Sequence, residues 1–199
     1  MTAEIAASDA RTPRGSATRD RILDAANAQF YTHGIRATSA DRIIEQVGIT
    51  KVTFYRHFRT KGELVVAYLA QQSQAEQAWL RSVARPGDPR AALREIAAGI
   101  GAASCRPEFR GCAFINAAAE FPDADDPVRT AVDAHRRWLR ENFAGIAAEA
   151  GATNADATAA QLMMLRDGAM VNGYLGNGEV VGGELAAAFL SVLDGAVRG

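Results

Sequence analysis

Residues 38–61 read TSADRIIEQVGITKVTFYRHFRTK, and they are the most informative part of the chain. Hydroxyl and carboxylate residues at 38–41 have the spacing of a capping box, in which side-chain oxygens accept hydrogen bonds from free backbone N–H groups at a helix start. Gly48 supplies a left-handed stop, and Thr50 is placed to cap the next helix, over 51–57. We therefore expect a helix, a tight turn and a second helix with hardly any loop.

The second of these helices has two chemically different faces. Phe54 and Phe58 are apolar and would hold the helix against a core. Side chains that can reach base edges in a DNA major groove lie in its first turn, namely Lys51, Val52 and Thr53. Side chains that can bond phosphates follow, namely Tyr55, Arg56, His57 and Lys61. Such a helix is suited to DNA recognition.

Charge is distributed unevenly along the chain, although the formal net charge is only -1. Residues 11–61 hold ten basic and four acidic side chains, whereas residues 71–199 hold twelve basic and sixteen acidic ones. A basic segment on a nearly neutral protein suggests a region that binds a polyanion. Chance clustering on a solvated face is the alternative.

Composition and periodicity predict an all-α fold in two domains. The chain has 42 alanines, the residue with the best helix propensity, and no alternating β-branched run long enough for a sheet. Residues 1–17 lack periodicity and are expected to form a flexible arm. After this arm we expect a first domain over 18–64 and a helical second domain over 65–199. Pro- and Gly-rich breaks delimit the later helices, expected over about 89–104, 111–121, 127–149, 155–175 and 184–197, the last two separated by a Gly-rich turn.

A family resemblance is carried by Arg21-Ile22-Leu23-Asp24-Ala25-Ala26, Phe30, Gly34, Thr38-Ser39, Ile43, Val47 through Phe58, Lys61 and Leu64. This pattern closely resembles the DNA-binding region of TetR-family regulators. The resemblance implies an N-terminal three-helix helix-turn-helix domain, and a C-terminal domain for ligand binding and dimerisation. By analogy, the DNA contacts are Thr38, Thr50, Lys51, Val52, Thr53, Tyr55, Arg56, His57 and Lys61.

The resemblance also implies a ligand pocket in the middle helices. The segment from Arg110 to Asn116 is similar to a Gly-Cys segment in some branches of the family. Candidate lining side chains are Phe109, Cys112, Phe114, Trp138, Met163, Met164 and Met170. Candidate polar groups that would orient a ligand are Asn116, Glu120 and Asp167. Ordinary core packing is the alternative for the apolar candidates.

The last two helices are expected to join two copies of the chain, as the resemblance implies. Their apolar and small residues are Leu162, Leu165, Ala169, Gly173, Tyr174, Leu185, Phe189 and Leu193. Alanine-rich helices at the end of a chain bury little area unless a partner covers them. Packing inside the same subunit is the alternative.

Together these features predict a DNA-binding transcription regulator that is not an enzyme: a repressor released from a palindromic operator by a small apolar or amphipathic ligand. Its expected partners are double-stranded operator DNA, a second copy and a small-molecule effector, with no membrane association. No signal segment and no apolar run of 18 residues are present, so we expect a soluble cytoplasmic protein. Neither a metal nor a cofactor is expected. The sequence leaves open the operator, the ligand, and repression against activation.

Three alternatives stay open at this point. Cys105 and Cys112 would allow a disulfide or a thiol sensor, or they are inert thiols. A thiol hydrolase would use Cys112 with His135, although no third orienting group is evident. A helical module that binds only proteins would leave the basic segment unexplained.

Overall fold

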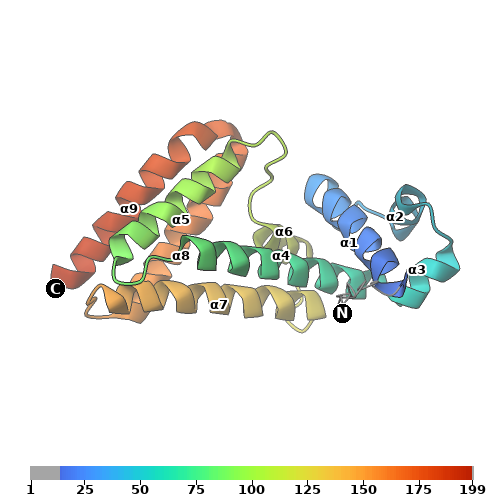
Figure 1. Cartoon of the computed structure of the whole chain (residues 1–199), viewed down its shortest axis with the longest axis horizontal. Helices are drawn as coiled ribbons and strands as arrows, with labels where there is room; N and C mark the ends of the chain where they lie inside the picture. The colour runs from blue at the N-terminus through green and yellow to red at the C-terminus, as the bar shows by residue number, and fades with distance from the viewer. Residues whose placement is uncertain (1–13, 199) are drawn as a thin grey trace, which may run out of the picture.

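The structure is a computed structural model, and it describes residues 14–198. Over that range the chain is helical and contains no strand (Figure 1), which confirms the all-α prediction. The helices are α1 (Arg14–His33), α2 (Ala40–Val47), α3 (Lys51–His57), α4 (Lys61–Val83), α5 (Pro89–Ser104), α6 (Ala113–Glu120), α7 (Pro127–Glu149), α8 (Ala155–Asn172) and α9 (Gly178–Arg198). A short π-helical turn, η1 (Gly173–Asn177), joins the last two.

Side-chain caps set the starts of the helices that follow α1. The Ser39 hydroxyl accepts from the Arg42 amide at 3.2 Å, and the Thr50 hydroxyl accepts from the Thr53 amide at 3.2 Å. Each such cap contributes about 1 kcal/mol. Gly48, at φ 71°, ends α2 in the left-handed conformation. The predicted helix-turn-helix is therefore present, with α3 over the residues expected.

The N-terminal boundaries differ from the prediction in two respects. Helix α1 begins at Arg14, so residues 14–17 of the expected arm are helical, while residues 1–13 lie outside the described part. Apolar periodicity cannot detect this start, because RGSAT carries no apolar stripe. The expected boundary between residues 64 and 65 falls inside α4.

The two predicted domains share one apolar core. The buried side chains of α1 to α4 pack in the same cluster as buried residues of α6 and α7, namely Cys112, Phe114, Ala117, Val128 and Val132. A second cluster lies among the end of α4, α5, α7, α8 and α9. Helix α4 passes through both, as Figure 1 shows. The C-terminal helices are thus packed directly against the helix-turn-helix.

The glycines between the last two helices have a different role from the one predicted. The chain reverses over Gly173–Asn177, with Gly176 at φ 102°, and α9 already begins at Gly178. Gly182 lies inside α9, where a Cβ on Gly101 of α5 would come within 2.7 Å of its Cα atom. Glycine is needed there for close helix approach, a requirement that is invisible until α5 and α9 are placed together.

Candidate nucleic-acid interface and adjoining cavity

Helix α3 presents most of the predicted DNA contacts to solvent. Val52 is 79% exposed and Tyr55 is 46% exposed, although both are large and hydrophobic. Phe54, on the opposite face, is fully buried and packs edge-on against Tyr55 at 5.2 Å between ring centroids. Thr50, Lys51 and Arg56 are also exposed, while Thr53, His57 and Lys61 are half-buried. A rigidly held helix therefore offers one apolar and several polar side chains outward.

Thr38 does not belong to this surface, which corrects the prediction for that residue. Its side chain is fully buried, and its hydroxyl donates to the Gly34 carbonyl oxygen at 2.8 Å. Thr38 thus fixes the turn between α1 and α2, because a buried hydroxyl must be satisfied inside the protein. His57 is also constrained, since its Nε2 atom is buried. Only the other ring nitrogen is left to face a phosphate.

Two lysines flank α3 in contrasting environments. Lys51 Nζ lies 2.9 Å from Asp41 Oδ1, and the hydrogen bond and charge of Asp41 raise the pKa of Lys51. The pair is exposed, so it contributes little to stability and leaves the ammonium group available. Burial lowers the pKa of Lys61, and the charge of Glu120 offsets part of this effect.

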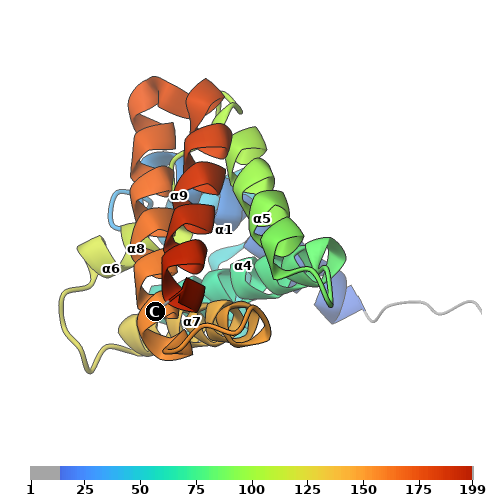
Figure 2. The same ribbon diagram turned by 90° about the vertical axis from the view of Figure 1, so that its left-hand side faces the viewer.

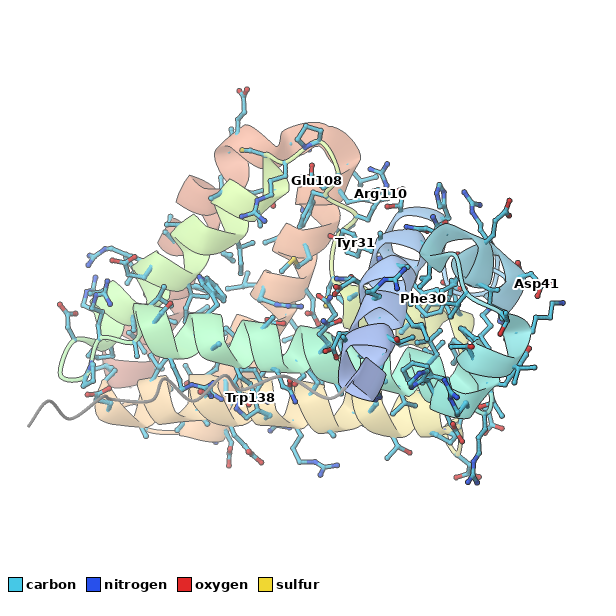
Figure 3. All side chains as sticks on the ribbon, turned by 45° about the vertical axis from the view of Figure 1, so that its right-hand side comes forward. Phe30, Tyr31, Asp41, Glu108, Arg110 and Trp138 are labelled. Carbon is cyan, nitrogen blue, oxygen red and sulfur yellow. The ribbon has the colours of Figure 1, made fainter. Side chains whose placement is uncertain are left out.

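A cavity of about 330 Å³ lies between the DNA-binding helices and the C-terminal helices. Its walls come from α1, α4, the end of α5, the α5–α6 connection, α6 and α8. The lining residues are Asn27, Tyr31, Gln72, Glu76, Ala103, Arg106, Glu108, Phe109, Gly111, Cys112, Ala113, Phe114, Arg166 and Met170. Figure 3 shows Tyr31, Glu108 and Arg110 near one another, with Trp138 on α7 away from them.

Four of the ten predicted pocket residues line this cavity, namely Phe109, Cys112, Phe114 and Met170. Asn116 and Glu120 instead line a second cavity of about 270 Å³ between α1 and α6. The others are placed elsewhere, which corrects the prediction. Met163 is buried in the C-terminal core, Met164 is exposed on α8, and Trp138 packs beside His135. Asp167 is in ion pairs with Arg136 and Arg166.

The polar lining residues were missed by sequence analysis. Asn27 and Tyr31 are four residues apart on α1, as Gln72 and Glu76 are on α4. Polar residues at that spacing share one helix face and resemble a solvated surface. Only the crossing of α1 and α4 turns both polar faces toward one cavity.

A buried ionic cluster forms one end of the cavity. Glu76 Oε1 accepts from Arg166 Nη2 at 3.0 Å, and Glu76 Oε2 lies 3.1 Å from His135 Nε2. Arg166 Nη1 also donates to Asp167 at 3.2 Å, and its side chain is 3% exposed. Burial alone would raise the pKa of Glu76, but the His135 hydrogen bond and the Arg166 charge outweigh it, so this pKa lies below its ordinary value.

The segment 110–121 connects the cavity to the DNA-binding helices. The Tyr31 hydroxyl donates to the Gly111 carbonyl oxygen at 2.9 Å and accepts from the Arg110 amide at 3.0 Å. At the other end of the segment, the Glu120 carboxylate accepts from the Ile35 amide at 2.9 Å and from the Arg36 amide at 2.6 Å. The segment thus contacts the turn before α2 while its first residues line the cavity.

Comparison with known proteins agrees with this arrangement. Residues 22–68 match the model for bacterial regulatory proteins of the tetR family, and residues 89–175 match the tetracyclin repressor-like C-terminal domain. A TetR-family transcriptional regulator from Streptomyces coelicolor superposes with a TM-score of 0.86, at 36% identity over 92% of this chain and 97% of that one. The chain belongs to the TetR family. It is therefore a DNA-binding transcriptional regulator of a family whose members are not enzymes.

Two other relatives extend the comparison. A TetR regulator (sav143) from Streptomyces avermitilis has a TM-score of 0.81 at 26% identity, covering 90% of this chain and 97% of that one. The transcriptional regulator AcrR of Shigella flexneri is 35% identical over 81 residues, 40% of this chain. That alignment spans only 38% of AcrR.

Most residues predicted for the dimer interface are buried within the subunit, but Leu165, Ala169 and Leu185 also line an open groove between α8 and α9. Leu162, Ala169, Gly173, Leu185, Phe189 and Leu193 are buried in the chain itself. Leu165 is half-buried, and Tyr174 is 53% exposed. The apolar stripes predicted as an interface face α5 and α7, since each helix buries its most apolar face first.

A different face of the same helices is apolar and uncovered. Over the side chains described, residues 17–197, the large exposed hydrophobic ones lie on α3 and on the α8–α9 hairpin. Those on the hairpin are Met164, Val171, Tyr174, Leu175, Val180 and Val197. By length and composition alone, the helical stretch Ala155–Val197 is long and apolar enough to cross a membrane. In the protein, 22% of its most apolar window is buried. Figure 2 shows α8 and α9 side by side in front of α1, and Figure 1 shows α9 on the opposite side of the molecule from α1.

The cysteines of this TetR-family chain are both free thiols, with Cys105 exposed and Cys112 buried. His135 does not face Cys112 as a base, because its ring nitrogens lie beside Ser73 and Glu76. Its ring stacks on Phe114, at 3.5 Å between centroids. Among the residues described, no group of three or more acidic, His or Cys side chains is arranged to hold a metal ion.

Proposed function

We propose that this chain is a ligand-responsive repressor that binds a palindromic operator as a homodimer in the bacterial cytoplasm. The observation that carries the proposal is the outer face of α3, where exposed Val52 and Tyr55 lie among cationic and hydroxyl side chains. An exposed apolar side chain is common on its own, but a methyl-bearing side chain among cationic and hydroxyl groups on the second helix of a helix-turn-helix suits a DNA major groove. Val52 is suited to a thymine methyl group, and Tyr55 and Arg56 to phosphates.

The second copy is proposed to cover the α8–α9 face. Met164 and Gly168 of α8 lie, with Glu184 and Ala188 of α9, along an open groove of about 230 Å³ between the two helices. Small residues let a partner helix approach closely, and obligate homodimers bury about 2,000 Å² or more. Two copies would place two α3 helices on a two-fold axis, which matches half-sites about one DNA turn apart.

The proposed effector binds the 330 Å³ cavity. A ligand there would touch α1 directly and would press on segment 110–121, which is bonded to the turn before α2 through Glu120. For the ligand to release DNA, it must bind one conformation of the dimer more tightly than the other. The favoured conformation must be the one in which the distance between the two α3 helices does not match the DNA half-sites. Segment 110–121 is therefore our proposed route from ligand to DNA.

Fluorescence anisotropy on DNA spanning the upstream region of the gene tests the proposal. We expect nanomolar binding that weakens steeply with salt, and a loss of at least tenfold for Tyr55→Ala. Arg56→Ala should reduce the slope of log affinity against log salt by about one, as expected for one lost phosphate contact. Arg137→Ala, an equally exposed arginine on α7, is the matched control. Unchanged affinity and slope in both α3 variants, on a DNA site obtained by selection, would contradict this interface.

A further inference from the structure

The buried charged groups that line the 330 Å³ cavity, Glu76 and Arg166, are already compensated by ion pairs. Glu76 accepts from Arg166 and lies 3.1 Å from His135 Nε2, and Arg166 also pairs with Asp167. Asp167 in turn accepts from Arg136 at 2.7 Å. At the edge of the cavity, Arg106 and Glu108 are exposed and of opposite sign. A charged ligand would lose its hydration without gaining an uncompensated counter-charge.

One pair of uncharged side chains in the wall keeps free hydrogen-bonding capacity. Gln72 Nε2 of α4 donates to Asn27 Oδ1 of α1 at 3.0 Å. A side-chain amide has two N–H donors and one carbonyl acceptor. Among the residues described, neither the Asn27 NH₂ group nor the Gln72 carbonyl oxygen has a further hydrogen-bond partner. The pair therefore keeps a free NH₂ group on Asn27 of α1 and a free carbonyl oxygen on Gln72 of α4.

The rest of the wall suits a flat apolar group. Phe109, Phe114 and Met170 line it, and Phe114 is held in place by stacking on the His135 ring. A volume of about 330 Å³ is at the lower end of the range for small-molecule sites. The ligand should therefore be small and mostly aromatic or aliphatic.

We infer that the effector is an uncharged, flat molecule carrying a carboxamide or lactam group, whose carbonyl accepts from Asn27 and whose N–H donates to Gln72. This inference rests on the proposed effector function of the cavity, and it names the chemical class that the cavity selects. Because Asn27 lies on α1 and Gln72 on α4, such a ligand would bond both helices at once.

Isosteric probes separate this class from its charged counterparts. 2-Naphthamide, 2-naphthoate and 2-naphthylmethylammonium share one ring system and differ in charge. Isothermal titration calorimetry on the full chain should give a dissociation constant for 2-naphthamide at least tenfold below those of the two ions. Asn27→Asp keeps the acceptor for Gln72 but loses the donor to the ligand carbonyl, and Gln72→Leu removes the acceptor for the ligand N–H. Each should weaken 2-naphthamide binding at least tenfold.

Gln74→Leu is the matched control, because it makes the same change on the exposed side of α4 and should leave binding unchanged. Thermal unfolding of each variant verifies that it is folded. Tighter binding of either ion, no binding of 2-naphthamide, or equal binding by all four proteins would overturn the inferred class. If 2-naphthamide binds as expected but leaves operator affinity unchanged, the class stands and the effector role of the cavity fails.

Discussion

Glu76 is the single residue on which the ionic cluster depends. Its carboxylate oxygens lie within ion-pair distance of Arg166 and His135, and its pKa lies below the ordinary value near 4.5. A lowered pKa means that the ionised group stabilises the fold above pH 4.5, and that this contribution is lost as pH falls through the lowered pKa. The cluster should therefore be intact at neutral pH and weaken only in acid.

Glu76→Gln should lower the free energy of unfolding by about 3 kcal/mol at pH 7, because it leaves the buried Arg166 with one carboxylate instead of two. The difference from wild type should shrink as the pH falls below 4.5 and through the lowered pKa of Glu76, because the unfolded chain takes up the proton before the folded carboxylate does. Urea unfolding at several pH values measures both effects. A gap that stays constant with pH would show that the charge of Glu76 is not its cause.

At the scale of helices, α5 and α9 depend on two glycines that face each other. A Cβ on Gly101 would lie 2.7 Å from the Gly182 Cα atom, closer than real Cβ contacts occur. We expect Gly101→Ala to push the helices apart and lower stability by about 2 kcal/mol or more, as overpacking does. Gly145→Ala in α7 meets nothing within 4 Å, and it should instead raise stability by about 0.5–1 kcal/mol. Thermal unfolding of both variants measures these stability changes. Equal changes in the two variants would contradict the close approach of α5 and α9.

Helix α6 is held to the turn before α2 by the Glu120 carboxylate. Replacing it in Glu120→Ala removes two charge-assisted hydrogen bonds, so the Ile35 and Arg36 amides should exchange hydrogen about tenfold faster or more. Asp125→Ala removes an exposed carboxylate just past α6 and is the control. Unaltered protection at both amides in Glu120→Ala would remove segment 110–121 as the proposed connection.

The whole molecule is expected to work as a dimer through the face that its own core leaves uncovered. Met164 is 67% exposed beside the α8–α9 groove. Met164→Glu would bury a charge without a partner, so we expect monomers in analytical ultracentrifugation and at least tenfold weaker operator binding. Ala134→Glu, on an exposed face of α7, should remain dimeric. A wild-type protein that sediments as a monomer would contradict the proposed assembly.

The local elements could be derived from sequence because their signals are local. Capping hydroxyls, stop glycines and proline breaks specify the starts and ends of α2, α3, α5 and α7, since each acts within about one turn of the chain. The buried Phe54 and the exposed Tyr55 follow from helical periodicity combined with the motif. The exposure of the candidate DNA-binding side chains is therefore largely predictable from sequence, apart from Thr38, whose burial depends on how α1 packs.

The cavity and the uncovered apolar face were decided only by tertiary structure. Asn27, Gln72 and Arg166 come from helices far apart in sequence, and they meet because α1 packs on α4 near its middle, where Arg166 of α8 also reaches Glu76. Likewise, periodicity shows that α8 and α9 carry apolar faces, but it does not show which face stays exposed. In the structure, α5 and α7 cover the more apolar face of each helix. Non-local packing selects among faces that local chemistry leaves equivalent.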